Sequence, residues 1–457
     1  MAAFFGADEI WSRADGTDEK ERVILAGVWK TTDKEVLSEE DFRHSLAELS
    51  ELAKACYMEV LDVVTQQLPR VDQGLYVRSG KAAEIAALVS ALHADRVIFN
   101  DTLSPSQIRN LQKLLKVPVT DRTRLILEIF ERRARTREAK LQVELAKLQY
   151  LKPRLIGMWE TQNRQGGASG SMSAKGEGET QLEIDRRTID HRLSELRREL
   201  KEVGKERETQ RKKRRGASLP LVALVGYTNA GKSTILNAMI ERWSEDPAAS
   251  ERKVFEADML FATLDTTVRR IDAAKGRSFL LSDTVGFIHR LPPSLVEAFH
   301  STLEEVAEAD LLLQVVDSSD EHCADHIEVT KRTVEALGAA HIPMITVFNK
   351  SDLCPDAEAA YPRRGFKEGS VDGIRNERLY ISAKEPSSIE FLTEVILEKL
   401  EEEHRPEEFL IPYQKGQVLS LLMENARVES TEYLEDGILV RGVMSAGLAD
   451  KVRKMLG

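Results

Sequence analysis

Two patterns of hydrophobic and polar positions alternate along much of this 457-residue chain: short apolar runs and segments of helical spacing. Residues 1–20 show no clear pattern, and we expect them to form a flexible tail. Short apolar runs then alternate with segments of helical spacing. Strands are expected at 22–28, 59–65 and 96–100, and helices at 39–54, 80–92 and 105–115. This alternation predicts a small parallel α/β domain over residues 21–120.

A second alternation of strands and helices, on a larger scale, covers residues 218–404. The strands expected there are 220–226, 278–283, 311–317, 344–349 and 379–381. They predict a doubly wound sheet, so we assign the chain to the α/β class. Residues 405–457 follow the order strand, helix, strand, strand, helix, with Glu435-Asp436-Gly437 as a hairpin turn. We expect this last region to form a small α+β domain.

Residues 121–217 lie between these regions and carry narrow apolar stripes flanked by charged positions. The stripes consist of Leu141, Leu145, Leu148 and Leu151, and of Ile189, Leu193, Leu196, Leu200 and Val203. Apolar residues three or four apart on both sides of a polar gap predict a hairpin of two helices. The gap holds two glycine-rich stretches, 166–171 and 175–180, which predict a flexible loop.

The acidic composition of the chain conceals one basic region. The formal net charge is −11, which by itself argues against a nucleic-acid partner. Residues 121–215 nevertheless hold 25 basic and 16 acidic side chains, a net charge of +9, while the rest of the chain carries −20. We therefore expect the hairpin to be either a solvated arm or a surface that contacts RNA through its shape and phosphates.

Composition also excludes several classes of protein. The three cysteines, Cys56, Cys323 and Cys354, are too few and scattered for a disulfide framework or a cysteine zinc site, and they indicate a reducing compartment. No apolar run is long enough to span a bilayer. The N-terminus carries early acidic residues and lacks the basic region of a signal peptide. We expect a cytoplasmic protein without a membrane partner.

The clearest chemical motif follows the strand expected at 220–226. Residues 226–233 read G-x-x-x-x-G-K-S and open a helix, which is the pattern of a phosphate-binding loop. Its glycines let backbone N–H groups converge on phosphate oxygens, and the helix N-terminus adds its positive dipole. Lys232 can reach the β- and γ-phosphates, and the Ser233 hydroxyl can ligate Mg²⁺.

Three further motifs follow in order, each at the carboxyl end of an expected strand. In D-x-x-G, Asp283 is expected to hold Mg²⁺ through water, and the Gly286 N–H to sense the γ-phosphate. The N-K-x-D motif ends at Asp352, whose carboxylate can accept from two guanine donors that adenine lacks. The S-A-K motif is expected to close the base pocket through a backbone N–H near Ala383. Four motifs in this order predict binding and hydrolysis of GTP with Mg²⁺.

Three side chains bear on the rate of hydrolysis. Phe287 follows D-x-x-G, where many small GTPases place a glutamine that orients the attacking water. Because an apolar ring cannot polarise water, unaided turnover should be slow. His289 is expected to be a polar loop residue rather than a base. Asn229, within the phosphate loop, is a candidate ligand for a K⁺ ion that would replace a missing cationic finger.

Some positions leave alternatives open or are decoys. The expected switch segment at 258–267 offers three candidate Mg²⁺ ligands, and position alone does not choose among Thr263, Thr266 and Thr267. Residues 78–81 read R-S-G-K but lack the upstream glycine of a second phosphate loop, so we expect a helix start there. Cys323 and His326 have ligand-like spacing but no second pair nearby to complete a zinc site.

Several motifs together resemble those of the HflX family of ribosome-associated GTPases. They are D-R-T at 121–123 with the apolar run 125–130, E-A-K-L-Q-V-E-L-A at 138–146, G-E-G-E-T-Q-L-E-I-D-R-R at 176–187, G-Y-T-N-A-G-K-S-T at 226–234, F-A-T-L-D at 261–265 and D-T-V-G-F-I at 283–288. The likeness runs from about residue 22 to the C-terminus. Two places depart from the family pattern: residues 175–179 read K-G-E-G-E rather than R-G-P-G-E, and residues 265–267 read D-T-T rather than D-P-T.

The resemblance implies a specific role and assigns site residues. It selects Thr263 as the Mg²⁺-facing threonine, and implies that the GTP form binds the large ribosomal subunit and rescues or splits stalled ribosomes. We expect a monomer that binds GTP or GDP and whose hairpin contacts rRNA. The rivals are an ATP-dependent RNA remodeller acting through the N-terminal domain, and a regulatory binding module that meets a protein partner.

The expected site residues fall into three groups. The catalytic group is Lys232, Thr263, Asp283 and Gly286; the metal ligands are Ser233 and Thr263 for Mg²⁺ and Asn229 for K⁺. The GTP contacts are Gly226, Tyr227, Thr228, Asn229, Ala230, Gly231, Lys232, Ser233, Thr234, Phe261, Ala262, Thr263, Leu264, Asp265, Asp283, Thr284, Val285, Gly286, Asn349, Lys350, Ser351, Asp352, Ser382, Ala383 and Lys384.

Overall fold

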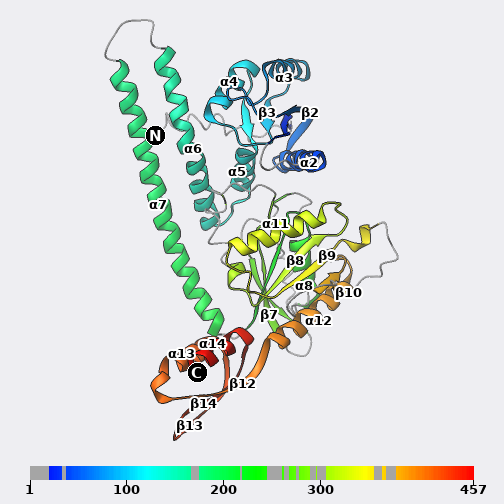
Figure 1. The fold of residues 1–457 in the computed structure, drawn as a ribbon, viewed down its shortest axis with the longest axis vertical. Helices are drawn as coiled ribbons and strands as arrows, with labels where there is room; N and C mark the ends of the chain where they lie inside the picture. Colours follow the sequence, from blue (N-terminus) through cyan, green and yellow to red (C-terminus); the bar gives the residue numbers. More distant parts are fainter. Residues whose placement is uncertain are drawn as a thin grey trace. The chain divides into compact units, whose positions relative to one another are not determined.

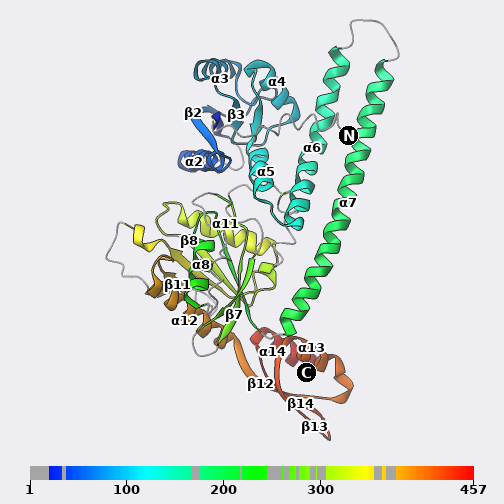
Figure 2. The same cartoon turned by 180° about the vertical axis from the view of Figure 1, so that it is seen from behind.

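The computed structural model divides the chain into two compact units that draw on separate stretches of sequence. The first holds Met1–Leu200, Asp258–Leu264 and His289–Phe299, and the second holds Lys201–Ala257, Asp265–Ile288 and His300–Gly457. Figures 1 and 2 show the fold from two opposite sides. The structure describes residues 20–32, 38–165, 174–216, 219–243, 260–261, 267–273, 277–288, 295, 305–354, 363–366 and 377–456. The domain boundaries expected near residues 120, 217 and 404 stay predictions.

The first unit contains a four-stranded parallel sheet in the order β2-β1-β3-β4. Its elements are β1 (Glu21–Lys30), α2 (Glu39–Ala55), β2 (Met58–Leu68), α3 (Ser79–Leu92), β3 (Arg96–Phe99), α4 (Pro105–Leu115) and β4 (Val119–Asp121). Capping boxes start two of the helices: the N-cap Ser38 pairs with Asp41 in the first turn of α2, and the N-cap Ser104 pairs with Gln107 in the first turn of α4. The predicted strands and helices are therefore present, and residues 78–81 begin α3 as expected.

Three helices follow the sheet: α5 (Arg122–Arg133), α6 (Arg137–Gln165) and α7 (Ala174–Gly216). α6 and the first part of α7 lie side by side and antiparallel (Figure 1). Arg192 of α7 donates to both carboxylate oxygens of Glu144 on α6, at 2.8 and 2.9 Å. Apolar side chains of both stripes, such as Leu145 and Leu196, are buried. The predicted helical hairpin is therefore present in the first unit.

One part of the hairpin prediction was wrong. We expected residues 175–180 to lie in the loop, but α7 begins at Ala174 and includes them. Lysine, glutamate and glutamine are good helix formers, and extending an existing helix costs much less than nucleating one. The two glycines of this stretch are therefore not enough to end it. The other glycine-rich stretch, 166–171, lies outside the described residues.

A buried carboxylate joins this hairpin to the sheet. Asp121 ends β4, is fully buried, and caps α5 by accepting from the Arg124 N–H at 2.9 Å. It also accepts from the Tyr150 hydroxyl at 3.0 Å and from the Arg154 guanidinium at 3.1 Å, both on α6. Burial raises the pKa of Tyr150 well above its usual range. The three donors compensate the Asp121 carboxylate for its lost hydration, and they connect β4, α5 and α6 through one side chain.

The second unit contains a seven-stranded sheet in the order β10-β11-β9-β8-β5-β7-β6. Its strands are β5 (Leu221–Gly226), β6 (Thr267–Asp272), β7 (Ser278–Asp283), β8 (Leu311–Asp317), β9 (Met344–Asn349), β10 (Arg363–Phe366) and β11 (Glu377–Tyr380). The five central strands are parallel and are those that the sequence predicts, whereas β6 and β10 are antiparallel edge strands that it does not. Both edge strands are short and polar, so their pattern lacks a buried face.

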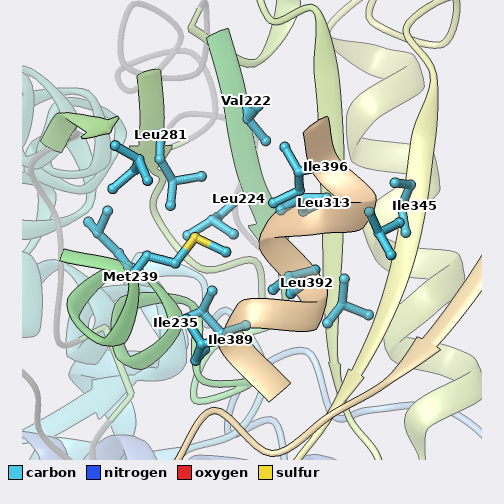
Figure 3. Close-up of a cluster of buried hydrophobic side chains, with 14 of the residues drawn as sticks. Val222, Leu224, Ile235, Met239, Leu281, Leu313, Ile345, Ile389, Leu392 and Ile396 are labelled. Carbon is cyan, nitrogen blue, oxygen red and sulfur yellow. The ribbon is translucent and has the colours of Figure 1, made fainter. Parts of the chain in front are cut away.

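Helices α8 (Lys232–Trp243) and α12 (Pro386–Glu403) bury their apolar faces against this sheet, as Figure 3 shows. Ile235 and Met239 of α8 and Ile389 and Leu392 of α12 belong to this core, together with strand residues such as Leu224. A second cluster packs around Val225 and Leu312 and includes residues of α11 (Cys323–Ala336). The predicted doubly wound α/β sheet is therefore confirmed, with apolar clusters formed from both sets of strand positions.

The C-terminal elements are β12 (His404–Ile411), α13 (Gly416–Asn425), β13 (Arg427–Leu434), β14 (Gly437–Ser445) and α14 (Ala446–Leu456). Their strands form an antiparallel sheet in the order β12-β14-β13, which matches the predicted order of elements. The predicted hairpin turn connects β13 to β14, and a Cβ atom at Gly437 would lie 2.4 Å from the Ile411 carbonyl oxygen. Among the described residues, no helix has both the length and the apolar character needed to cross a membrane.

Candidate functional site

The candidate site is built on the carboxyl ends of the parallel strands of the second unit, beginning with the loop after β5. Two glycines in that loop have no room for a side chain. A Cβ atom at Gly226 would lie 2.2 Å from the Val315 carbonyl oxygen, and one at Gly231 would lie 2.2 Å from the Asn349 amide nitrogen. Gly231 and Asn229 also have positive φ angles, of 94° and 59°. Asparagine and glycine tolerate this left-handed conformation better than other residues, so the residue types at these positions favour the backbone conformation of the loop.

Lys232, the first residue of α8, turns its ammonium group back onto this loop. Its Nζ donates to the carbonyl oxygens of Gly226 at 3.0 Å and Tyr227 at 2.6 Å. Burial lowers the pKa of Lys232 to about 8, although the nearby Asp283 carboxylate raises it. The Lys232 ammonium group is therefore desolvated and held by two backbone carbonyl groups of the phosphate loop. Such a group interacts strongly with any anion that enters the loop.

The second predicted motif meets the first through one side-chain contact. The Ser233 hydroxyl donates to Asp283 Oδ2 at 2.7 Å, which joins the start of α8 to the end of β7. Asp283 is buried and Ser233 is half-buried. A hydroxyl and a carboxylate are the hard oxygen donors that Mg²⁺ prefers, so the chemistry of this donor pair fits that ion.

The D-x-x-G motif is also bonded to the phosphate loop through the backbone. The Thr228 N–H donates to the Phe287 carbonyl at 2.8 Å, and the Phe287 N–H donates to the Gly226 carbonyl at 3.0 Å. A Cβ atom at Gly286 would lie 2.8 Å from the Thr228 side chain, so glycine is required at this close approach. The Phe287 ring is buried in the cluster around Val225. Phe287 is therefore a structural core residue as well as the occupant of the glutamine position.

The third and fourth motifs meet at Asn349. Its Nδ2 donates to the Ala230 carbonyl of the phosphate loop at 3.0 Å, and its Oδ1 accepts from the Ala383 N–H at 2.9 Å. Asn349 is buried, so these bonds replace hydration that the amide has lost. The amide therefore holds the phosphate loop, the end of β9 and the S-A-K segment together.

The remaining residues of these two motifs lie close by in the chain. Lys350 has a positive φ of 62° and its Nζ contacts Asp317 Oδ2 at 2.6 Å. Asp352 belongs to a short 3-10 helix (Ser351–Leu353) and is exposed. An exposed carboxylate three residues after the buried Asn349 is available to a ligand base that brings its own donors. The Thr284 hydroxyl, also in the predicted set, donates to the Leu224 carbonyl at 2.6 Å.

The switch segment is only partly described. Ala262, Thr263, Leu264 and Asp265 lie outside the described residues, as does His289. Phe261 is described, and its side chain is buried in the first unit, edge to face with Phe130 at a ring-centroid distance of 4.7 Å. The structure therefore places the Phe261 ring against a helix side chain.

One contact at the site has no counterpart in the sequence motifs. The ring of Tyr227 in the phosphate loop stacks on the ring of His326 on α11, with centroids 3.7 Å apart and planes 13° apart. Sequence spacing singled out His326 only for its distance from Cys323, as a poor metal pair. Nothing in the local pattern could link it to Tyr227, because packing alone brings α11 beside the loop.

Three family models match successive parts of the chain. They are described as GTP-binding GTPase N-terminal, GTP-binding GTPase Middle Region and 50S ribosome-binding GTPase, and they match residues 43–131, 133–214 and 221–350 respectively. The strands β5 to β9 and the D-x-x-G motif fall within the third match, which ends inside the N-K-x-D motif, at Lys350. The first and second matches together cover most of the first unit.

Curated proteins named GTPase HflX are similar to this chain over most of its length. The one from Caldanaerobacter subterraneus is 40% identical, covering 96% of this chain and 94% of its own. The one from Escherichia coli is 40% identical and covers 93% of each chain. The one from Alkalihalophilus pseudofirmus is 46% identical, covering 74% of this chain and 75% of its own.

Proposed function

The chain belongs to the HflX family of GTPases, which bind and hydrolyse GTP, and from this premise we propose that its nucleotide state controls binding to the large ribosomal subunit. In this proposal the protein acts in the cytoplasm as a monomer and splits stalled ribosomes.

The observation that carries the GTP assignment is the bridge made by Asn349. One buried amide bonds both the Ala230 carbonyl of the phosphate loop and the Ala383 N–H. We assign the loop residues 226–234 to the phosphates, and Asp352 with residues 382–384 to the guanine. Asp352 would accept from the guanine N1–H and amine, and adenine would leave that carboxylate without a donor pair.

Mg²⁺ is the metal that we assign to this site. Ser233 and Thr263 would hold the ion, and Asp283 would hold it through water. The bound ion would neutralise charge on the β- and γ-phosphate oxygens. Lys232 would stabilise the same oxygens from the other side, and the Gly286 N–H would donate to the γ-phosphate. The contact between Ser233 and Asp283 supports this assignment because it gathers the two oxygen donors at the edge of the phosphate loop.

We propose that turnover on the protein alone is slow and depends on K⁺. The buried Phe287 ring offers no polar group to orient water. Asn229 is exposed on the phosphate loop in a left-handed conformation, where its side-chain oxygen would help to hold a monovalent cation against the phosphates. Hydrolysis measured in K⁺ and Na⁺ buffers tests this assignment, and equal rates would contradict it.

The helical hairpin is the region that we assign to rRNA. Its segment, residues 121–215, carries a net charge of +9 in a chain whose total is −11. Contacts between such a segment and RNA phosphates release counterions, so ribosome binding should weaken steeply as salt rises. A binding module that uses its helices to meet a protein partner would show little salt dependence.

Sedimentation with ribosomes tests the nucleotide control. The full chain would be pelleted with large subunits in a non-hydrolysable GTP analogue, in GDP, and without nucleotide. We expect association in the analogue and release in GDP, because the γ-phosphate orders switch loops that hydrolysis frees. Equal association in both nucleotides would overturn the proposal. Lys232→Ala provides the control, since it should remove the difference without altering the hairpin.

A further inference from the structure

We infer that His326 is a positioning residue for GTP hydrolysis, acting through the ring of Tyr227 on the phosphate loop. The two rings are nearly parallel and in contact, with centroids 3.7 Å apart. Both residues are 6% exposed, so little water competes with the contact. The inference rests on the proposed assignment of Lys232 and the phosphate loop to the phosphates of GTP, and it is independent of the proposed ribosomal role.

The contact leads to the phosphate site in two steps. The first is the stack, which restrains Tyr227. The second is the hydrogen bond that the Tyr227 carbonyl accepts from Lys232 Nζ. At 2.6 Å it is shorter than the bond of 3.0 Å from the same Nζ to the Gly226 carbonyl. A shift of the Tyr227 backbone would therefore move an acceptor of the lysine that faces the phosphates. His326 would never touch the nucleotide, yet it would set the place of a group that does.

The neighbours of Tyr227 make this position sensitive. Gly226 and Thr228, on either side of it, hold Phe287 by two backbone hydrogen bonds of 3.0 and 2.8 Å. Tyr227 and Phe287 thus face each other across a parallel bridge between the phosphate loop and the end of the D-x-x-G motif. Restraint on the Tyr227 ring is therefore restraint on both the loop and the segment assigned to the γ-phosphate.

α11 holds His326 firmly enough to serve as this support. His326 lies in the first turn of α11, and its carbonyl accepts from the Thr330 hydroxyl at 2.8 Å. On its other side, His326 Nδ1 is 3.8 Å from Asp320 Oδ2. The Gln314 side chain of β8 donates to the Ile327 carbonyl at 2.9 Å, which joins α11 to the sheet beside His326. The ring is therefore carried by a helix that is attached to the central sheet.

The test compares His326→Ala, which removes the stack, with His326→Phe, which keeps an aromatic face. His341→Ala is the matched control, because His341 is an exposed histidine of the same unit whose ring Nδ1 lies 3.1 Å from the Gly338 carbonyl oxygen. For each full-length variant, kcat and KM for GTP, the Kd of GDP and the thermal unfolding midpoint would be measured. These quantities separate a local effect on the loop from a general loss of folded protein.

We expect His326→Ala to lower kcat/KM for GTP about threefold to tenfold, which corresponds to the range typical of an aromatic pair. His326→Phe should recover most of this loss, and His341→Ala should leave kcat/KM unchanged. An unchanged kcat/KM in His326→Ala would overturn the inference. It would equally be overturned if His326→Phe were as impaired as His326→Ala, since the stack would then not be the cause.

A second route keeps the inference testable if His326→Ala does not fold. Tyr227→Leu removes the stack from the loop side, His326→Leu removes it from the helix side with less loss of volume than alanine, and a double variant combines the two changes. We expect Tyr227→Leu to lower kcat/KM as much as removal of the histidine ring should, with no further loss in the double variant. Additive losses would show that the two rings act independently and would contradict the inference.

Discussion

Phe130 of α5 and Phe261 meet edge to face in the first unit, with ring centroids 4.7 Å apart and planes at 89°. Both side chains are buried. Phe261 belongs to the first unit, although the chain on either side of Asp258–Leu264 belongs to the second. Thr263, which we assign to Mg²⁺, follows Phe261 by two residues, so the ring contact lies close to it in the sequence.

Removal of the Phe130 ring should loosen the chain at Leu260 and Phe261. In Phe130→Leu, we expect faster hydrogen exchange at the amides of Leu260 and Phe261, because the segment loses an aromatic partner and opens more often. Phe99→Leu is the control, since it removes a buried ring from the core of the same unit, where Phe99 packs against Tyr76. Equal increases in both variants would mean that Phe130 has no specific hold on the segment.

The contact between Ser233 and Asp283 predicts the metal dependence of the enzyme. Ser233→Ala removes a hydroxyl that we assign to Mg²⁺, and it leaves Asp283 without this 2.7 Å donor. We expect the Mg²⁺ concentration for half-maximal GTP hydrolysis to rise about 10-fold to 100-fold. Titration of Mg²⁺ at saturating GTP measures this change. Thr234→Ala, at the next position, should leave the Mg²⁺ requirement as it is.

The exposed carboxylate of Asp352 predicts a change of base preference. Asp352→Asn presents an amide that can donate, so it no longer matches the two donors of guanine but suits the added carbonyl of xanthine. We expect the affinity for GTP to fall and that for xanthosine triphosphate to rise, which reverses the preference. Competition between the two nucleotides measures it. A variant that loses both affinities equally would show that Asp352 does not read the base.

Cys56 predicts a pH dependence of folding. Burial, followed by the Glu128 carboxylate, raises the pKa of its thiol from 9.0 to about 12. The thiol therefore stays protonated in the folded unit at pH values where it ionises in the unfolded chain. Its contribution to stability is complete below pH 9 and is lost as pH rises toward 12, by up to about 4 kcal/mol in total.

Denaturant unfolding at a series of pH values measures this loss. Cys56→Ala should show a smaller fall in the free energy of unfolding between pH 9 and pH 11 than the unaltered protein. Alkylation at pH 9 adds a second readout: the half-buried Cys323 and Cys354 should react well before Cys56. Identical pH profiles for the two proteins would contradict the assignment to this thiol.

Local patterns were sufficient for much of the fold. The predicted bounds of β7, β8 and β9 agree with the structure residue for residue, because each is an apolar run ended by a polar motif. The edge strands β6 and β10 escaped the same reasoning. β6 reads T-V-R-R-I-D, and it forms because its backbone pairs antiparallel with β7. Pairing of this kind depends on a neighbour and leaves little trace in hydrophobicity.

The sequence by itself determined the chemistry of this protein. The roles that we assign to the phosphate-loop glycines, Lys232, Ser233 and the short motifs after β7 and β9 rest on backbone freedom and functional groups that can be recognised within a few residues. Tertiary structure alone decided which distant groups support them. The stack of Tyr227 on His326, the Asn349 bridge and the contact of Phe130 with Phe261 join residues far apart in the chain. Such contacts arise from how helices and strands pack together. The partner of a packed side chain leaves no periodic pattern in the sequence from which it could be predicted.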